Sequence, residues 1–201
     1  KTGEFPEDFV KAITDGGWLG IAMPEEYGGA GLGIMEAAVL AHTISNSGAG
    51  FSGASAVHLN LFGPHPIVVF GTEEQKKRFL PPLIKGEDRA CFAVTEPDSG
   101  LNTMALKTEA VRDGDNYIIN GRKLWTTTAQ TANKILLITR TSAADSGAAP
   151  GKSLTLFYTD LNRDRIEVRE IEKMGRGAVD SNSLFIDDLV VPVTDRIGEE
   201  G

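Results

Sequence analysis

Cysteine is almost absent from this sequence: Cys91 is the only one in 201 residues. A disulfide needs two cysteines, so the chain can form none internally, and such a composition suits a reducing compartment. No apolar run reaches the roughly 20 residues that a membrane-spanning helix requires. The first residues also lack the apolar core of a secretory signal peptide. We therefore expect that the protein does not interact with a membrane.

Basic residues are the minority among the charged ones. The sequence has 20 Lys and Arg against 28 Asp and Glu, so its net charge is −8. A nucleic-acid-binding surface is basic, and this excess of acid argues against one. Histidine is scarce, and His58 and His65 have no Cys, Asp or Glu partners at the spacing of a metal site. We expect neither nucleic acid nor a metal ion to bind.

The first half of the chain has the periodicity of helices. Apolar positions three and four apart predict helices over residues 6–17 and 34–45. Thr72 and Gln75 have the spacing of a capping box that opens a helix over 73–80, and Pro81-Pro82 is expected to end it. Residues 47–55 are small and suggest a loop or a close helix contact. Prolines within 60–70 predict a broken or kinked helix there.

From about Ala90 onward, alternating patterns replace the helical ones. They predict seven or eight short strands, with Asn120-Gly121 as the clearest hairpin turn and residues 142–152 as a mobile excursion. The expected fold class is α+β, an N-terminal all-α helical domain followed by an antiparallel β-barrel or sandwich. We place the domains at 1–88 and 89–197, with 198–201 as the beginning of a further domain.

Two stretches of the second half suit a ligand with a flat ring. Residues 91–95 are strand-like and run into the turn Glu96-Pro97-Asp98-Ser99-Gly100, which presents small polar groups. Trp125 and the threonines that follow it arrive on another predicted strand. An indole beside hydroxyl groups can cover a ring and meet its heteroatoms. Taken alone, the same residues could equally be an ordinary loop and a core aromatic.

Several runs of residues together resemble the acyl-CoA dehydrogenase family. They occur in that family's order and spacing over nearly the whole chain. The runs are 71–76 with 80–83, 93–100, 107–110, 114–126, 173–175 and 187–192.

The resemblance implies an FAD-dependent enzyme that oxidises acyl-CoA thioesters to trans-2-enoyl-CoA. A carboxylate base removes the α-proton, and the β-hydrogen leaves as hydride to flavin N5. In the family the base comes from a C-terminal helical domain. We therefore expect this chain to be a fragment that contains no catalytic residue and is inactive alone. The resemblance also implies an electron-transferring flavoprotein as redox partner, a homo-oligomer that is tetrameric at full length, and a location in the bacterial cytoplasm or the mitochondrial matrix.

The same resemblance assigns roles to individual positions. Phe92 begins the flavin loop, and Val94 and Thr95 meet the edge of the flavin ring. Trp125, Thr126 and Thr127 lie by the isoalloxazine, with Thr127 near N5 and O4. Gly100 and Leu101 close the loop near the pyrophosphate, and Leu101 with Asn102 faces the thioester end of the substrate.

One departure from the family pattern leaves other functions possible. Most family members have Gly-Ser-Asp where this chain has Gly100-Leu101-Asn102, so a hydroxyl and a charge are missing. A flavin-dependent acyl-CoA oxidase or monooxygenase of the same fold is one alternative, and a non-catalytic scaffold is another. Glu96 could be taken for a substitute base, but its turn context favours a loop-anchoring role.

Overall fold

The computed structural model describes residues 3–142 and 150–201. The chain divides into two compact units. The helical unit comprises Lys1–Ala90 together with Glu172–Asp180, and the sheet unit comprises Cys91–Ile171 together with Ser181–Gly201. The chain therefore leaves the sheet unit once, contributes a short segment to the helical unit, and returns.

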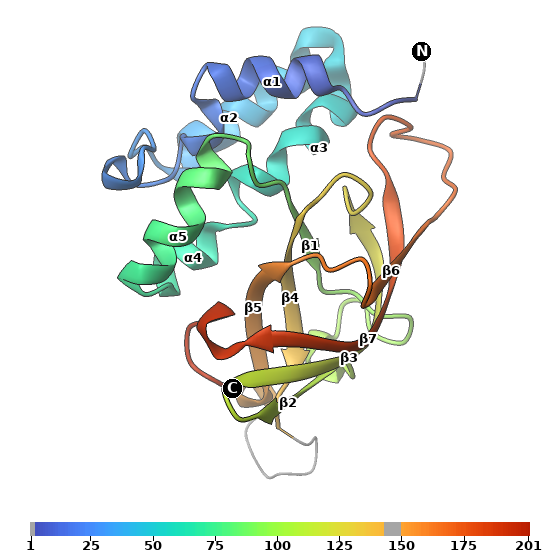
Figure 1. Cartoon of the computed structure of the whole chain (residues 1–201). Coiled ribbons are helices and arrows are strands. Elements are labelled where there is room, and N and C mark those ends of the chain that lie inside the picture. The colour runs from blue at the N-terminus through green and yellow to red at the C-terminus, as the bar shows by residue number, and fades with distance from the viewer. Residues whose placement is uncertain (1–2, 143–149) are drawn as a thin grey trace. The chain divides into compact units, whose positions relative to one another are not determined.

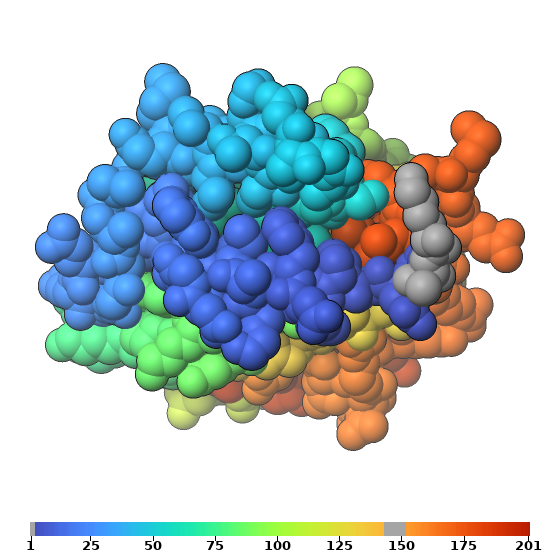
Figure 2. Space-filling view, turned by 90° about the horizontal axis from the view of Figure 1, so that it is seen from above, coloured from blue at the N-terminus to red at the C-terminus, as the bar shows by residue number. Residues whose placement is uncertain are grey.

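The helical unit contains the helices of the first half of the chain (Figure 1). They are α1 (Glu7–Asp15), α2 (Ile34–Ile44), α3 (Gly50–Leu61), α4 (His65–Phe70) and α5 (Glu73–Ile84), with short turns at Trp18–Gly20, Glu25–Tyr27 and Ser45–Ala49. In the space-filling view of Figure 2, the blue to cyan residues of α1, α2 and α3 adjoin one another on one surface. None of the helices in the described ranges is long and apolar enough to cross a bilayer.

One apolar cluster holds α1, α2 and α3 together. It includes Val10, Ala37, Ile44 and Val57, all buried. Val179, which is fully buried in the same cluster, comes from the segment that the chain contributes after the sixth strand. Burial of apolar surface is the main stabilising term in such a cluster, so the helical unit depends on a residue far along the sequence.

The start of α5 is as the sequence predicts. The backbone N–H of Gln75 donates to Thr72 Oγ1 at 3.2 Å, and the Thr72 N–H donates to Gln75 Oε1 at 2.9 Å. The predicted end at Pro81-Pro82 is wrong, because α5 continues to Ile84. Leu80, Leu83 and Ile84 are buried, and this packing offsets the hydrogen bonds that the prolines cannot donate.

Of the two alternatives predicted for residues 47–55, the structure supports the close helix contact over most of that range, since α3 begins at Gly50. The small residues Gly53, Ser55 and Ala56 are buried there, so they allow close packing of α3. The break predicted within 60–70 is confirmed: α3 ends at Leu61 and α4 begins at His65, after Gly63 and Pro64.

The strands follow in the second half of the chain and build the sheet unit (Figure 1). They are β1 (Ala90–Ala93), β2 (Glu109–Asp113), β3 (Asn116–Thr127), β4 (Lys134–Arg140), β5 (Leu154–Asp160), β6 (Ile166–Glu170), β7 (Ser181–Pro192) and β8 (Arg196–Ile197). Their order in the sheet is β6-β7-β3-β2-β4-β5-β8, and β1 pairs with β4.

The α+β class is confirmed, with two corrections to the sheet. Its path runs from β6 to β8 without closing, so the term barrel fits only loosely. The sheet is also mixed, because β2 pairs with β4 in parallel at Glu109 and Arg140. The pairs β2–β3, β3–β7, β4–β5, β5–β8 and β6–β7 are antiparallel. Part of the predicted excursion, residues 143–149, lies outside the described residues.

Asn120-Gly121 is not a hairpin turn. Both residues lie inside β3, and the turn between β2 and β3 is at Gly114 instead. Gly121 is needed for a different reason, because a Cβ there would lie 2.4 Å from Thr108 Oγ1. The side chain of Asn120 bridges to β7: its Nδ2 donates to Asp188 Oδ1 at 3.0 Å, and its Oδ1 accepts from Asp188 N at 2.8 Å.

Candidate cofactor site

The two stretches singled out in the sequence lie side by side in the sheet unit. The N–H of Leu124, in β3, donates to the carbonyl oxygen of Thr95 at 2.8 Å. This bond lies one residue before Trp125, so the Val94–Thr95 segment and the Trp125–Thr127 segment are neighbours. Phe92, two residues earlier in β1, is half-buried.

Trp125 lies at an irregularity of β3. Lys123 pairs with Leu184 and Thr126 with Asn182, so β3 contains one residue more than β7 over this stretch. Trp125 has φ of +60°, a conformation that costs a bulky residue about 1–3 kcal/mol. Bulges of this kind redirect a side chain. Here the indole is 55% exposed at the end of a long strand, where a ligand can reach it.

The two threonines after Trp125 differ in exposure. Thr127 is half-buried, whereas Thr126 is 1% exposed. The carbonyl of Thr126 accepts from Asn182 Nδ2 at 2.9 Å. Its Oγ1 is buried and has no hydrogen-bond partner among the described residues. The side chain of Thr127 is thus accessible beside the indole, while that of Thr126 is shielded from solvent.

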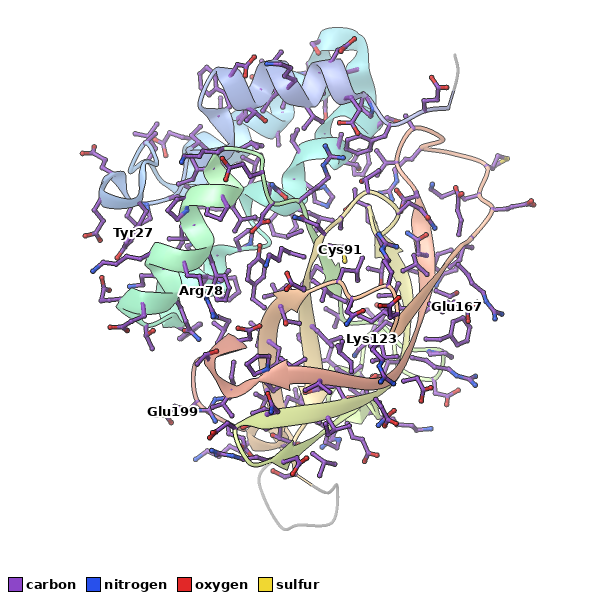
Figure 3. The ribbon with its side chains drawn as sticks, in the orientation of Figure 1. Tyr27, Arg78, Cys91, Lys123, Glu167 and Glu199 are labelled. Carbon is purple, nitrogen blue, oxygen red and sulfur yellow. The ribbon has the colours of Figure 1, made fainter. Side chains whose placement is uncertain are left out.

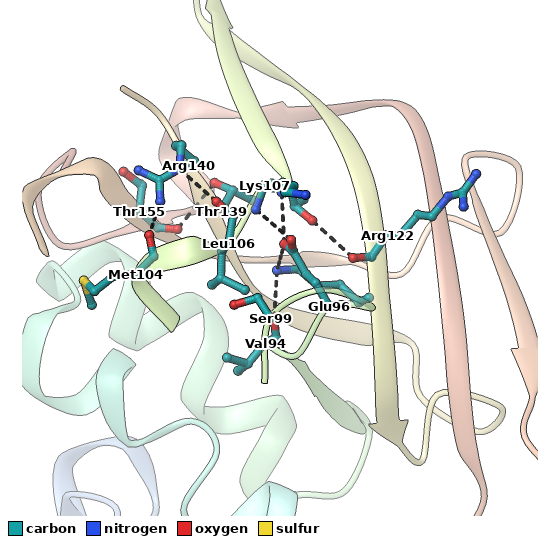
Figure 4. Close-up of polar contacts among 12 residues, drawn as sticks. Val94, Glu96, Ser99, Met104, Leu106, Lys107, Arg122, Thr139, Arg140 and Thr155 are labelled. Carbon is teal, nitrogen blue, oxygen red and sulfur yellow. Dashed lines mark hydrogen bonds and ion pairs between the residues drawn. The ribbon is translucent and has the colours of Figure 1, made fainter. Parts of the chain in front are cut away.

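Glu96 anchors the loop that follows β1, as its turn context predicted (Figure 4). Its Oε2 accepts from Lys107 N at 2.6 Å, and its Oε1 accepts from Thr108 N at 2.9 Å. Oε1 also lies 2.9 Å from Lys123 Nζ. Burial alone would raise the pKa of Glu96, but the bonds from Thr108, Lys107 and Lys123 outweigh it, so this pKa lies below its ordinary value.

Lys123 is the site residue that sequence reasoning missed. Its side chain is completely buried, and its ammonium also donates to Val94 O at 3.0 Å (Figure 3 labels Lys123). Burial lowers the pKa of Lys123, and the Glu96 carboxylate partly offsets this effect. The alternation of inward-facing and outward-facing residues along β3 could have revealed this burial, since Tyr117, Ile119 and Lys123 fall on the buried face of the strand. A lysine on that face requires a carboxylate partner.

The loop beyond Glu96 is closed at its base and exposed at its tip. Glu96 and Ser99 exchange backbone hydrogen bonds of 2.9 and 3.1 Å. Ser99 Oγ then donates to Asn102 O at 2.6 Å. Gly100, Leu101 and Asn102 are exposed, and Leu101 is completely so. These predicted contact residues therefore project from a fixed base rather than packing into the unit.

Arg140 supports the segment that connects this loop to β2. Its Nε donates to Leu106 O at 2.8 Å and its Nη2 to Met104 O at 2.6 Å (Figure 4). Residues Thr103–Ala105 form a short helical turn there, and β2 begins four residues later, at Glu109.

The helical unit has a hollow of its own, with a volume of about 320 Å³. Phe51, Ser55, His58 and Arg176 are among its lining residues. The Nδ1 of His58 lies 2.8 Å from Ser55 O and, facing a carbonyl, donates to it. Burial lowers the pKa of His58, and the charge of Arg176 lowers it further, although the bond to Ser55 opposes both. The described residues hold no cluster of three or more His, Cys, Asp or Glu side chains suited to a metal ion.

The sheet-unit site has the chemistry that a flavin requires. An exposed indole, a half-buried threonine and the half-buried Val94–Thr95 segment lie beside one another. An aromatic plane next to hydroxyl and backbone groups suits a flat ring with polar edges. A Cβ on Gly100 would meet no described heavy atom within 4 Å, so the loop tip is open to a ligand. The residues present fit FAD.

Comparisons with known proteins cover both units. The model of the acyl-CoA dehydrogenase N-terminal domain matches residues 1–87, and that of the acyl-CoA dehydrogenase middle domain matches residues 91–189. An acyl-CoA dehydrogenase of Bacillus subtilis is 33% identical over 100% of this chain and 52% of its own length. A 3-(aryl)acrylate reductase of Clostridium sporogenes is 34% identical over 99% of this chain and 52% of its own length.

A solved structure agrees with these matches. The acyl-CoA dehydrogenase from Geobacillus kaustophilus is 31% identical, with a TM-score of 0.87 over 98% of this chain and 51% of that one. The chain spans about half the length of the curated relatives it matches. With two family models covering nearly every residue, the chain belongs to the acyl-CoA dehydrogenase family of flavoprotein oxidoreductases.

Proposed function

We propose that this chain forms the flavin-binding part of an enzyme that oxidises acyl-CoA thioesters to trans-2-enoyl-CoA. The observation that carries the proposal is the exposed Trp125 next to Thr95, in a chain that matches both family models. The domain boundaries 1–88 and 89–197 are proposed with it, and 198–201 as the beginning of a further domain.

The residues of the sheet unit would hold the cofactor. Trp125 would cover the ring system with its indole, and Thr127 would offer a hydroxyl to the heteroatoms near N5 and O4. Val94 and Thr95 would meet the ring edge, with Phe92 behind them and Thr126 contributing through its backbone. FAD, when bound, supplies a hydride acceptor, which no protein side chain offers. The role of this chain is to orient that acceptor and to keep water from it.

The exposed loop tip would face the pyrophosphate and the thioester. Leu101 is fully exposed in this chain, and covering such a side chain contributes about 1.5–3 kcal/mol. Leu101 thus offers apolar contact where most members offer a serine hydroxyl. Asn102 keeps a hydrogen-bonding amide but no charge. We propose that this difference acts on the choice of acyl group.

The base that removes the α-proton is proposed to lie outside residues 1–201. Glu96 is unsuited to that role, because both of its oxygens accept hydrogen bonds and its pKa lies below the ordinary value. A base works best with a pKa near the working pH. The proposed electron acceptor is an electron-transferring flavoprotein, and the proposed assembly is a homo-oligomer, a tetramer at full length. The proposed location is the bacterial cytoplasm or the mitochondrial matrix.

The experiment that tests this function follows the flavin absorbance. The natural full-length protein is loaded with FAD, kept anaerobic and mixed with a panel of saturated acyl-CoAs. Bleaching by one of them supports the proposal and identifies the acyl group. Because one relative is named a reductase, the chemically reduced protein is also mixed with 2-enoyl-CoAs and with free aryl acrylates. Reoxidation by a free acrylate alone, or failure to bind FAD, would overturn the proposal.

A further inference from the structure

Glu96 connects three separate segments of the sheet unit. It belongs to the loop after β1, it accepts the N–H groups of Lys107 and Thr108 before β2, and it pairs with Lys123 of β3. Lys123 adds a second connection, since its ammonium also donates to Val94 O. The proposed ring-edge segment and the strand that presents the indole are therefore joined by two buried side chains.

The connection lies immediately before the bulge. Lys123 is the last residue of β3 in regular pairing before the shift, and the next residue, Leu124, donates to Thr95 O. Trp125 then adopts its positive φ. A conformation of this kind persists only where the surrounding structure imposes it. The buried pair and the Leu124–Thr95 bond, together with the pairing of Lys123 with Leu184, hold the chain directly before Trp125.

We propose that Glu96 and Lys123 are positioning residues that hold Val94–Thr95 and Trp125–Thr127 at the separation a bound flavin requires. This inference rests on the proposed function. Neither side chain can touch the ligand from solvent, because Glu96 is 5% exposed and Lys123 1%. They act through the backbone of the residues that do. An isosteric apolar pair could fill the same space, but it could not hold the carbonyl of Val94 or the N–H groups of residues 107 and 108.

The test uses three variants of the natural full-length protein. Lys123→Met removes the ammonium and keeps the length of the side chain. Glu96→Gln removes the charge. The amide NH2 group of the new side chain cannot accept a hydrogen bond from the backbone N–H groups of residues 107 and 108. Lys107→Met is the matched control, since the Lys107 ammonium pairs with Asp98 at 3.0 Å in the same loop but is 73% exposed. Such an exposed pair contributes little.

Three quantities are measured at a temperature where every variant is folded: the FAD dissociation constant, the flavin midpoint potential, and kcat and KM separately. For K123M and E96Q we expect weaker FAD binding, a shifted potential, and a fall in kcat of about a hundredfold, as small misplacements of reacting groups cause. K107M should match the wild type in all three.

The outcomes separate this inference from the function on which it rests. A wild-type protein that takes up no FAD overturns both. A wild-type protein that binds FAD, with folded K123M and E96Q variants that keep its affinity, potential and kcat, overturns the positioning role alone. Loss of stability without a change in potential or kcat also overturns it, because a merely structural pair would give that result.

Discussion

Gly121 and Thr108 approach so closely that a methyl group on Gly121 would lie 2.4 Å from Thr108 Oγ1 and 2.7 Å from its Cα. The Gly121→Ala variant must shift the backbone of Thr108, which costs about 1–3 kcal/mol of unfolding free energy. Urea denaturation measures this loss. Gly177→Ala is the control, since a Cβ on Gly177 would meet no described heavy atom within 4 Å. Equal unfolding midpoints for the two variants would contradict the prediction.

The Glu96–Lys123 pair should dominate the local stability of the sheet unit. Lys123→Met leaves a buried carboxylate without its counter-charge, which costs about 3–5 kcal/mol. The double variant E96Q/K123M should recover part of this loss, because no buried charge remains. Chemical denaturation of both variants and the wild type measures the difference. A double variant less stable than K123M would contradict the expectation.

The same pair predicts a pH dependence. Glu96 has a pKa below its ordinary 4.5 in the folded state, so its contribution is fully present above that value and is lost as the pH falls through the lower, folded pKa. The stability difference between wild type and Glu96→Gln should therefore be constant near neutral pH and shrink below 4.5. Denaturation series at several acidic pH values test this. A difference that grows on acidification would show the opposite shift.

Thr126→Val should stabilise the protein by about 1 kcal/mol, because it removes a buried hydroxyl with no partner among the described residues. Thr128→Val is the matched control. Thr128 is equally buried, but its Oγ1 donates to Thr127 O at 2.6 Å, so this variant should lose stability. Thermal unfolding compares them. If T126V is destabilised instead, the hydroxyl has a partner in solution, such as a buried water or a bound ligand.

At position 125 a glycine variant should be more stable than an alanine variant, which is the reverse of the usual order. Trp125→Ala and Trp125→Gly lose the same indole, but only glycine tolerates φ of +60° without a steric penalty. We expect W125G to be the more stable by about 1 kcal/mol, and both to bind FAD weakly. Leu124→Ala and Leu124→Gly provide the control, where alanine should be the better residue. The same order at both positions would contradict the strained bulge.

His58 should titrate below its ordinary value of 6.5, because burial disfavours the imidazolium. Since its folded pKa is the lower one, the stability that it contributes is present above 6.5 and is lost as the pH falls through the folded pKa. Proton NMR of the imidazole resonances measures the value directly. In Arg176→Gln the pKa of His58 should rise, because a nearby positive charge is removed.

Local rules predicted those parts of the fold that depend on neighbouring residues. The Thr72–Gln75 capping box involves residues three apart, and the loop-anchoring role of Glu96 follows from its turn. The rules failed where distant packing decides. Pro81 and Pro82 remain within α5 because the buried residues around them stabilise the helix. Asn120 forms hydrogen bonds with Asp188 instead of a turn. The local sequence shows neither the residues that pack around the prolines nor the Asp188 partner of Asn120.

The exposed residues of the candidate site were predictable from the sequence, whereas the buried residues that hold them in place were less so. The resemblance singled out Trp125, Thr127 and Val94–Thr95, and the structure brings these segments together. Lys123 was missed, because a lysine in a strand usually faces water. Its burial depends on Glu96, which lies 27 residues earlier in the sequence.

The segment Glu172–Asp180 has a consequence for how the protein can be divided. Val179 completes the core of the helical unit, although it is encoded between two strands of the other unit. No single cut in the polypeptide separates two whole units. A recombinant piece ending near residue 90 would expose the apolar surface that Val179 covers, and during synthesis the ribosome must pass β6 before the helical core can close.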